Sequence, residues 1–185
     1  MSLQGKTAFI TGGGKNLGAL VASQLAAEGA NIAIHYHGAS TTKAAGSLQI
    51  FANVLEDFGK LDIVVNTVGM VLKKPLVDIS EQDYDSMFAV NSKSAFFITQ
   101  EAAKAVEDGG KIVNIVTALL AAYTGYYTAY QGSKGPVEWF TKGLSKEFMS
   151  RGLLDLYAQE TEDSIAYLKS GAIDGRLTKI EDIGH

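Results

Sequence analysis

Tyr130 and Lys134 are the two residues whose types and spacing best suit proton transfer. Residues four apart lie on one face of a helix. An isolated tyrosine has a pKa of roughly 10 and exchanges protons poorly at neutral pH, but a nearby lysine cation stabilises the phenolate. Lowering the tyrosine pKa by about two corresponds to roughly 2.7 kcal/mol of differential interaction between its protonated and deprotonated forms. A tyrosine in this setting could exchange a proton with a substrate oxygen.

Thr117 supplies a second hydroxyl for the same chemistry. It follows the apolar, β-branched run Ile112–Val116, which is typical of a buried strand. A hydroxyl at the strand end could hold the substrate oxygen as charge develops on it. Tyrosine and lysine at this spacing also occur by chance as a surface pair. The elements that precede them must therefore support the prediction.

The first 36 residues have the pattern of a βαβ unit. An apolar run at 7–10 leads into a glycine-rich turn at 11–18, then apolar residues at helical spacing, then a second strand at 31–36. Gly29 marks the end of the helix. The crossover should be right-handed.

The glycine-rich turn fits a dinucleotide. Glycine lets the backbone approach a pyrophosphate, and the amides of the following helix point at the anion. The spacing is Thr-Gly-x-x-x-Asn-x-Gly, so a plain tight turn is the alternative. We predict cofactor binding by Gly12, Gly14, Lys15, Asn16, Leu17 and Gly18.

Strands and helices continue to alternate along the chain. We expect a buried strand at 61–65, a helix opened by a capping box of Ser80 and Asp83, and a helix around Lys134 that Pro136 kinks or delays. A short helix at 161–168 is possible. This alternation predicts a doubly wound, Rossmann-like α/β fold: a parallel sheet with helices on both faces in a single domain, 1–185, with ligands at the strand carboxyl ends.

Composition narrows the function. The chain has 185 residues, a net charge of −4 and no cysteine. These values do not favour nucleic acid, an anionic membrane, disulfides or a cysteine metal site. No apolar stretch is long enough to span a bilayer, and a strand begins by Thr7, which leaves no room for a signal peptide. We expect a cytoplasmic protein without a bound metal.

Together these motifs resemble the short-chain dehydrogenase/reductase family, and within it most closely the 3-oxoacyl-[acyl-carrier-protein] reductase-like members. The turn at 11–18 is similar to the family's Thr-Gly-x-x-x-Gly-x-Gly loop, and 66–69 to its Asn-Asn-Ala-Gly motif. The segment 175–183 resembles the opening of its last helix. Four residues match its catalytic tetrad: Asn91, Thr117, Tyr130 and Lys134.

The resemblance implies a role for each residue. Tyr130 would be the general acid in reduction, Lys134 would lower its pKa and bind the nicotinamide ribose, and Thr117 would hold the carbonyl. Asn91 would support a water relay to Lys134. Asn66, Val68 and Gly69 would contact the cofactor. A homotetramer is implied, with helices around Asn91 and Trp139 at one interface.

The chain departs from the family pattern in several places. Asn16 replaces a glycine, although asparagine tolerates a left-handed backbone best of the remaining residues. Thr117 replaces serine, which keeps the hydroxyl but narrows the pocket. Thr67 and Val68 replace asparagine and alanine, which alters the packing on the cofactor side.

The end of the second strand bears on cofactor choice. Tyr36 and His37 stand where NAD enzymes carry an acid for the ribose 2′-hydroxyl, and Lys15 lies in the glycine loop. A cation without a nearby acid favours a 2′-phosphate, so we predict NADP, with NAD the weaker candidate. His35 and His37 are as readily explained as surface histidines.

The chain is short for the family. Between His37 and Asn66 there is no room for two helices and a third strand, and no strand leads to a Pro-Gly loop after Arg151. We expect further residues near 47/48 and 152/153, roughly twenty at each position, because a βα crossover needs about a dozen. We also expect a C-terminal strand after 185.

Three hypotheses follow for function. The first is an NADP-dependent reductase of ketones, with 3-oxoacyl thioesters as leading substrates, free or on an acyl carrier. The second is a dinucleotide-binding protein without catalysis. The third is another reaction on the same scaffold, such as epimerisation or dehydration. The tyrosines at 123, 126 and 127 and the segment 153–172 would form the substrate walls.

Overall fold

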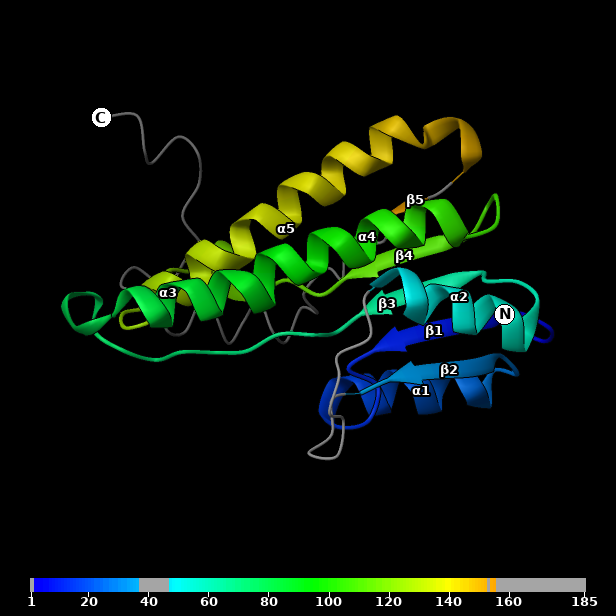
Figure 1. Ribbon diagram of the computed structural model, residues 1–185, viewed down its shortest axis with the longest axis horizontal. Coiled ribbons are helices and arrows are strands. Elements are labelled where there is room, and N and C mark those ends of the chain that lie inside the picture. Colours follow the sequence, from blue (N-terminus) through cyan, green and yellow to red (C-terminus); the bar gives the residue numbers. More distant parts are fainter. Residues whose placement is uncertain (1, 37–46, 153, 156–185) are drawn as a thin grey trace.

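A computed structural model describes residues 2–36, 47–152 and 154–155. Five parallel strands form one sheet in the order β2-β1-β3-β4-β5 (Figure 1). Alternation of apolar strands with amphipathic helices produces this arrangement, and the predicted doubly wound parallel fold is confirmed. The strands are β1 Thr7–Thr11, β2 Asn31–His35, β3 Ile63–Asn66, β4 Lys111–Asn114 and β5 Leu154–Asp155.

Helices connect the strands. They are α1 Asn16–Ala27, α2 Ser47–Phe58, α3 Glu81–Phe88, α4 Ser94–Ala105 and α5 Thr128–Glu147. A π-helical segment, Ala89–Lys93, joins α3 directly to α4. The predicted helices at 161–168 and 175–183 lie outside the described residues.

Helix α5 corrects one prediction. It begins at Thr128, so the late start expected from Pro136 is wrong. A proline inside a helix removes one hydrogen bond and costs roughly 3 kcal/mol. Burial of Val137 and Thr141 against the rest of the protein offsets that cost, which local propensity could not show.

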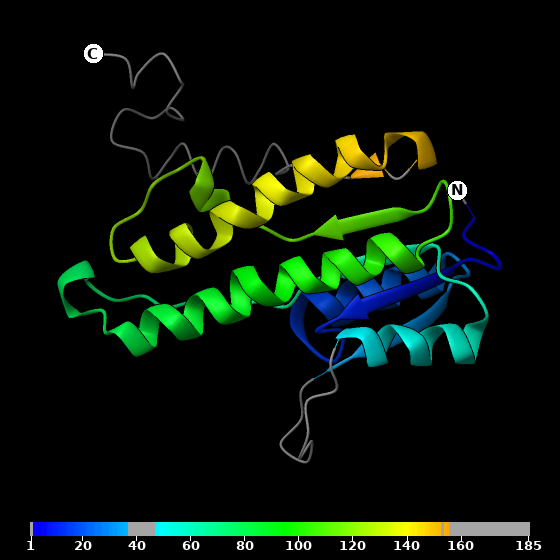
Figure 2. The same ribbon diagram turned by 45° about the horizontal axis from the view of Figure 1, so that its top comes forward.

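The two faces of the sheet have separate cores. On one face Ala8, Ile10 and Val65 pack against α1. On the other face Phe9 and Val64 belong to a larger cluster with α2 and α4, onto which the end of α5 packs. Figures 1 and 2 show α1 on one side of the sheet and α4 with α5 on the other. The two layers hold the strand ends in fixed register.

The sheet ends on one side at β2, which pairs only with β1 among the described strands. Ile34 in this edge strand is 47% exposed. Ser47 begins α2, and Leu153 lies outside the described residues. The additional segments expected near these two positions stay a prediction.

Helix α3 and the first turns of α5 extend past the carboxyl ends of β3 and β4 (Figures 1 and 2). The start of α3 is fixed by the predicted capping box. Asp83 N donates to Ser80 Oγ at 3.1 Å, and Ser80 N donates to Asp83 Oδ2 at 3.0 Å. Such reciprocal capping satisfies two backbone donors. The helices therefore frame the edge of the sheet where the predicted site lies.

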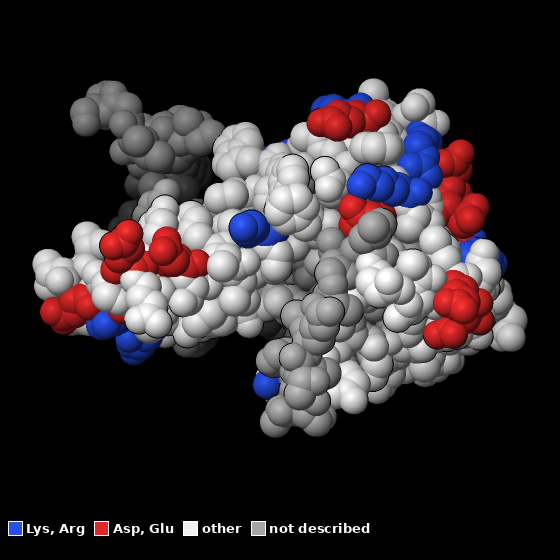
Figure 3. All heavy atoms as spheres, viewed as in Figure 1, with Lys and Arg blue, Asp and Glu red and all other residues white. Residues whose placement is uncertain are grey.

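Charges are mixed over the surface. In Figure 3 the described Lys and Arg side chains lie among Asp and Glu, without an extended basic patch on this face. Within the described ranges, no helix is long and apolar enough to cross a membrane. The same ranges contain no group of three or more His, Cys, Asp or Glu suited to a metal ion.

Candidate active site

The glycine loop joins β1 to α1 at the carboxyl edge of the sheet. Gly12 has φ of 71° and Asn16 has φ of 50°, both in the left-handed region. Asparagine adopts this conformation more readily than other side chains, which explains how Asn16 can replace a glycine here. A Cβ on Gly18 would lie 2.4 Å from the Gly12 carbonyl oxygen, so only glycine lets α1 start this close to β1.

The middle of the loop lies against β2. Gly13 N donates to the His35 carbonyl at 3.0 Å. A Cβ on Gly13 would meet Ile34 Cγ2 at 2.7 Å, and one on Gly14 would meet Tyr36 Cβ at 2.9 Å. This glycine loop, here called the cradle, thus packs too closely against Ile34 and Tyr36 to admit a side chain at these two positions. The requirement at Gly13 was missed from the sequence, although three consecutive glycines were the signal.

Tyr36 and Lys15 border this cradle. Tyr36 is 60% exposed and packs on Gly14, and Lys15 is exposed. Within the described part of the chain, Lys15 has no ion pair. His37 lies outside the described residues. An ammonium beside the loop, with no acid at the end of β2, keeps the geometry suited to a phosphate.

Buried polar groups cross-link the strand ends. Thr11 Oγ1 donates to Asn66 Oδ1 at 2.6 Å, and Asn66 Nδ2 donates to Asn114 Oδ1 at 3.1 Å. Asn114 Nδ2 in turn donates to Thr99 in α4 and Thr141 in α5, both at 3.0 Å. This network ties three strands to two helices. Asn114 was not predicted, because nothing local in the sequence marks its partners.

Asn91 lies in the π-helical segment and is fully buried. Its Oδ1 accepts from Met70 N at 2.8 Å, and its Nδ2 donates to Met70 O at 2.8 Å and to Ser133 Oγ at 2.9 Å. The side chain therefore clamps the loop after β3 to α5. Its amide has no donor left for a water.

Lys134 is buried at 5% exposure beside this clamp. Its Nζ donates to the Ile115 carbonyl, just after β4, at 2.8 Å. A Cβ on Gly69 would lie 3.2 Å from the same Nζ and 3.3 Å from Asn91 Oδ1. The structure therefore brings together Gly69, Asn91 and Lys134. Burial lowers the pKa of Lys134 from its ordinary value.

Tyr130 and Thr117 occupy neighbouring elements. Tyr130 is half-buried in the first turn of α5, and Thr117 follows β4. Thr117 Oγ1 accepts from Leu119 N at 3.3 Å, which leaves its O–H free to donate. In the part of the chain described, no hydrogen bond joins the two hydroxyls to each other. They are positioned from separate elements.

Ser133 was missed from the sequence. It is fully buried, and its Oγ donates to the Tyr130 carbonyl at 2.8 Å while accepting from Asn91. Ser92 Oγ also donates to the Ser133 carbonyl. A small polar residue directly before Lys134 was the available signal. Ser133 fixes the turn of α5 that carries both Tyr130 and Lys134.

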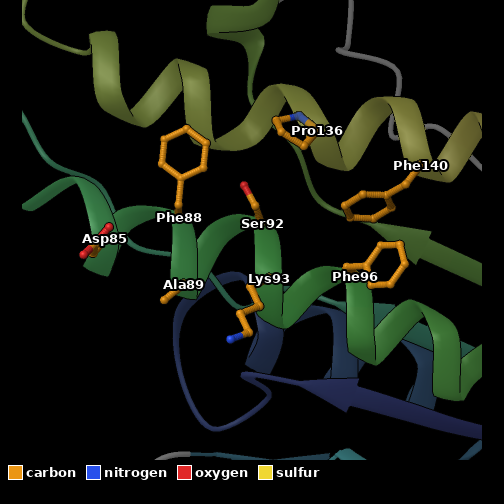
Figure 4. A pocket seen from close by; sticks show the side chains of 8 residues that line it. All are labelled: Asp85, Phe88, Ala89, Ser92, Lys93, Phe96, Pro136 and Phe140. Atoms are coloured by element: carbon orange, nitrogen blue, oxygen red, sulfur yellow. The ribbon is translucent and has the colours of Figure 1, made fainter.

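An apolar groove of about 510 Å³ lies between the π-helical segment with α4 and the middle of α5. Figure 4 shows Phe96 and Phe140 facing each other there, with ring centroids 5.5 Å apart. None of the predicted catalytic residues lines this groove. It is therefore separate from the candidate active site.

The family model described as "Enoyl-(Acyl carrier protein) reductase" matches residues 13–153. The chain belongs to the short-chain dehydrogenase/reductase family. The predicted family resemblance is thereby confirmed. A putative dehydrogenase from Burkholderia cenocepacia, solved with bound NADP, is 40% identical with a TM-score of 0.75, and the match covers 98% of this chain and 85% of that one.

Two fungal relatives are also similar. Hydroxynaphthalene reductase-like protein Arp2 of Metarhizium brunneum is 33% identical over 169 residues, 78% of this chain and 63% of that protein. Elsinochrome reductase 1 of Elsinoe fawcettii is 29% identical over 172 residues, 77% of this chain and 62% of that protein. The chain thus spans under two thirds of the length of these relatives.

Proposed function

We propose that this chain is an NADP-dependent oxidoreductase that reduces a ketone to a secondary alcohol, with Tyr130 as the proton donor. The observation that carries the proposal is the buried ammonium of Lys134. It is held at 2.8 Å by the Ile115 carbonyl and lies four residues after Tyr130. Burying an ammonium is unfavourable, so a buried lysine with a shifted pKa is a candidate for a functional role.

The glycine loop fits the cofactor. A Cβ on Gly13, Gly14 or Gly18 would clash with neighbouring protein atoms, so these glycines let the loop pack closely at the start of α1, where backbone amides favour a pyrophosphate. Lys15 and Tyr36 would face the 2′-phosphate, and the predicted contribution of His37 lies outside the described residues. Asn66, Val68 and Gly69 would line the nicotinamide side. The NADP bound to the Burkholderia neighbour supports NADP over NAD here.

Tyr130, Thr117 and Lys134 would each have a separate role in proton transfer. Bound NADPH supplies the hydride. Tyr130 donates its proton to the carbonyl oxygen, and Thr117 donates a hydrogen bond to the same atom. The charge on Lys134 offsets the negative charge left on the phenol oxygen. Asn91, whose side chain is occupied by Met70 and Ser133, would serve a water relay by positioning its neighbours.

Two substrate classes remain candidates. The sequence resemblance implies a 3-oxoacyl thioester, free or on an acyl carrier, although the family model's description names an enoyl thioester, in which a C=C bond is reduced. The fungal relatives' names support a bicyclic aromatic ketone. Exposed apolar side chains in the two loops before α3 and α5 favour the aromatic ketone, because flat rings stack on such surfaces. These side chains are Met70, Val71, Tyr123 and Tyr126, and the half-buried Tyr127 follows Tyr126 in the second loop.

A dinucleotide-binding protein without catalysis is the second candidate. It is motivated by two departures from the family pattern, Asn16 in place of a glycine and Thr117 in place of serine. It predicts cofactor binding without turnover of any ketone. The third hypothesis, epimerisation or dehydration on the same scaffold, predicts turnover without net consumption of NADPH.

We also infer a homotetramer. Trp139 is 70% exposed on α5, and the groove between α4 and α5 is lined by Phe88, Phe96 and Phe140. Large exposed apolar surfaces of this kind favour association. Light scattering on the purified protein would test it, and a monomeric mass would contradict it. A cytoplasmic location remains a proposal.

A carbonyl screen with NADPH and with NADH tests the function. Bicyclic aromatic ketones and 3-oxoacyl thioesters are supplied separately, and absorbance at the nicotinamide band follows turnover. We expect oxidation of NADPH with at least one class and weaker activity with NADH. Tight NADPH binding with no turnover of any ketone would favour the non-catalytic candidate.

A further inference from the structure

We propose that Lys73 and Tyr127 form a second binding point for the substrate, one that takes an acidic oxygen located beyond the reacting carbonyl. The inference rests on the proposed ketone reduction and names a feature of its substrate. The acidic oxygen would belong to a carboxylate or to an acidic phenol.

A continuous line of contacts leads from the catalytic phenol to this ammonium. The rings of Tyr127 and Tyr130 meet edge to face, with centroids 6.3 Å apart. Lys73 Nζ lies over the Tyr127 ring, 5.8 Å from its centroid. Because both distances are measured to the Tyr127 ring, the ammonium can be no farther from the Tyr130 ring than 5.8 Å and 6.3 Å together, about 12 Å.

The ammonium of Lys73 is available for a ligand. The neighbouring Lys74 is paired with Asp83 at 2.7 Å, whereas Lys73 is exposed and forms no ion pair in the described part of the chain. Contact with an aromatic face favours a cation but leaves its outward N–H groups free to donate. An anionic oxygen is the partner that satisfies them best.

Lys73 and Tyr127 are here called the arm, and the backbone holds them in place. Lys74 N donates to the Tyr126 carbonyl at 2.7 Å, which joins the loop after β3 to the loop before α5. Tyr126 has φ of 70°, an unusual conformation for a residue with a bulky side chain. Backbone strain of this kind persists where the surroundings enforce it, often at ligand sites. The Lys74–Tyr126 bond therefore fixes the arm relative to the loop that leads into α5 and Tyr130.

The reach of the arm selects among substrates. A fused-ring ketone with its carbonyl at Tyr130 can stack on Tyr127 and place an acidic group near Lys73. The phosphodiester of an acyl carrier lies at the far end of a long pantetheine chain, so it cannot occupy this position while the carbonyl reacts. The arm thus favours small acidic ketones over carrier-bound ones.

The test uses three matched ketones: a tetralone carboxylate, its methyl ester and the corresponding phenol. In Lys73→Met we expect kcat/KM for the carboxylate to fall about fivefold through KM, with kcat within about twofold, because a partly exposed ion pair is worth about 1 kcal/mol. The ester should be unaffected, and Lys73→Arg should retain the preference. The response of the phenol shows whether it shares the site. High salt should weaken only the charged substrate.

Lys146→Met is the matched control. It removes the same charge at the far end of α5, about 24 Å along the helix from Tyr130. It should leave kcat/KM for all three ketones unchanged.

Equal effects of Lys73→Met on kcat/KM for the acid and the ester, or no effect on either, would overturn the inference while ketone reduction stands. If the wild-type protein turns over none of these ketones and no 3-oxoacyl thioester, the proposed function fails separately. Binding of the acid to the NADPH-loaded protein, compared between wild type and Lys73→Met, then still decides the role of Lys73.

Discussion

Replacing Gly69 by alanine should separate catalysis from stability. The new Cβ would lie 3.2 Å from Lys134 Nζ and 3.3 Å from Asn91 Oδ1, closer than ordinary van der Waals contact. Neither neighbour can move freely, because Lys134 is held by Ile115 at 2.8 Å and Asn91 by Met70 at 2.8 Å. Gly69 does not have a positive φ, so alanine fits the backbone itself.

The expected magnitudes follow from these contacts. Alanine stabilises a compatible glycine position by about 0.4–1 kcal/mol through the unfolded state, and overpacking costs about 1–3 kcal/mol. The free energy of unfolding should therefore fall by no more than about 2.6 kcal/mol. A displacement of about 1 Å at an active site can lower the rate about a hundredfold. A shift of a few tenths of an ångström should lower kcat about tenfold.

The assay combines ketone-dependent NADPH oxidation with urea unfolding and NADPH binding. Gly135→Ala is the control, since its Cβ would meet nothing within 4 Å although it adjoins Lys134 in sequence. It should keep full activity and gain stability within α5. A Gly69→Ala protein with unchanged kcat would show that the position of Lys134 does not limit the reaction, and the reasoning would fail.

Three further predictions concern other parts of the molecule. Lys15→Ala should raise the KM for NADPH about tenfold and leave the KM for NADH unchanged, because a charge-assisted contact is worth about 1.5 kcal/mol. Steady-state kinetics with each cofactor would check this, and a parallel rise of the two KM values would contradict it. Asn114→Leu should lower the free energy of unfolding by about 2–3 kcal/mol in urea, because Asn66 and two buried threonines lose their partner; a change below about 0.5 kcal/mol would contradict the network. A hydrogen bond from Lys74 lowers the pKa of Asp83 from 3.8 to about 2, so its contribution is complete above the ordinary value and is lost as pH falls from 3.8 toward 2. Urea midpoints of Asp83→Asn should therefore vary less over that range than those of the wild type, and equal variation would refute this assignment.

Local pattern was enough to predict the fold class and four of the five described strands, but not β5 at Leu154–Asp155. The apolar runs at 7–10 and 61–65 mark β1 and β3 to within two residues, because buried parallel strands are continuously apolar. The capping box at Ser80 and the left-handed Asn16 also follow from local chemistry.

Other features depend on long-range contacts that a sequence pattern does not contain. The π-helical segment around Asn91 and the contact of Ser133 with Asn91 form only when α4 meets α5. The pairing of Asn114 with Thr141 likewise spans two elements. The late start of α5, one of the two effects predicted for Pro136, was wrong for the same reason, since tertiary burial overrode a local signal.

The most direct test of the account is the Tyr130→Phe protein. This change removes the phenol oxygen and keeps the ring that packs against Tyr127. General acid catalysis contributes about 10²–10⁴-fold, so NADPH-dependent ketone reduction should fall by about a thousandfold while the Kd for NADPH stays within about threefold. A reduction rate close to that of the wild-type protein would contradict the central claim that Tyr130 supplies the proton.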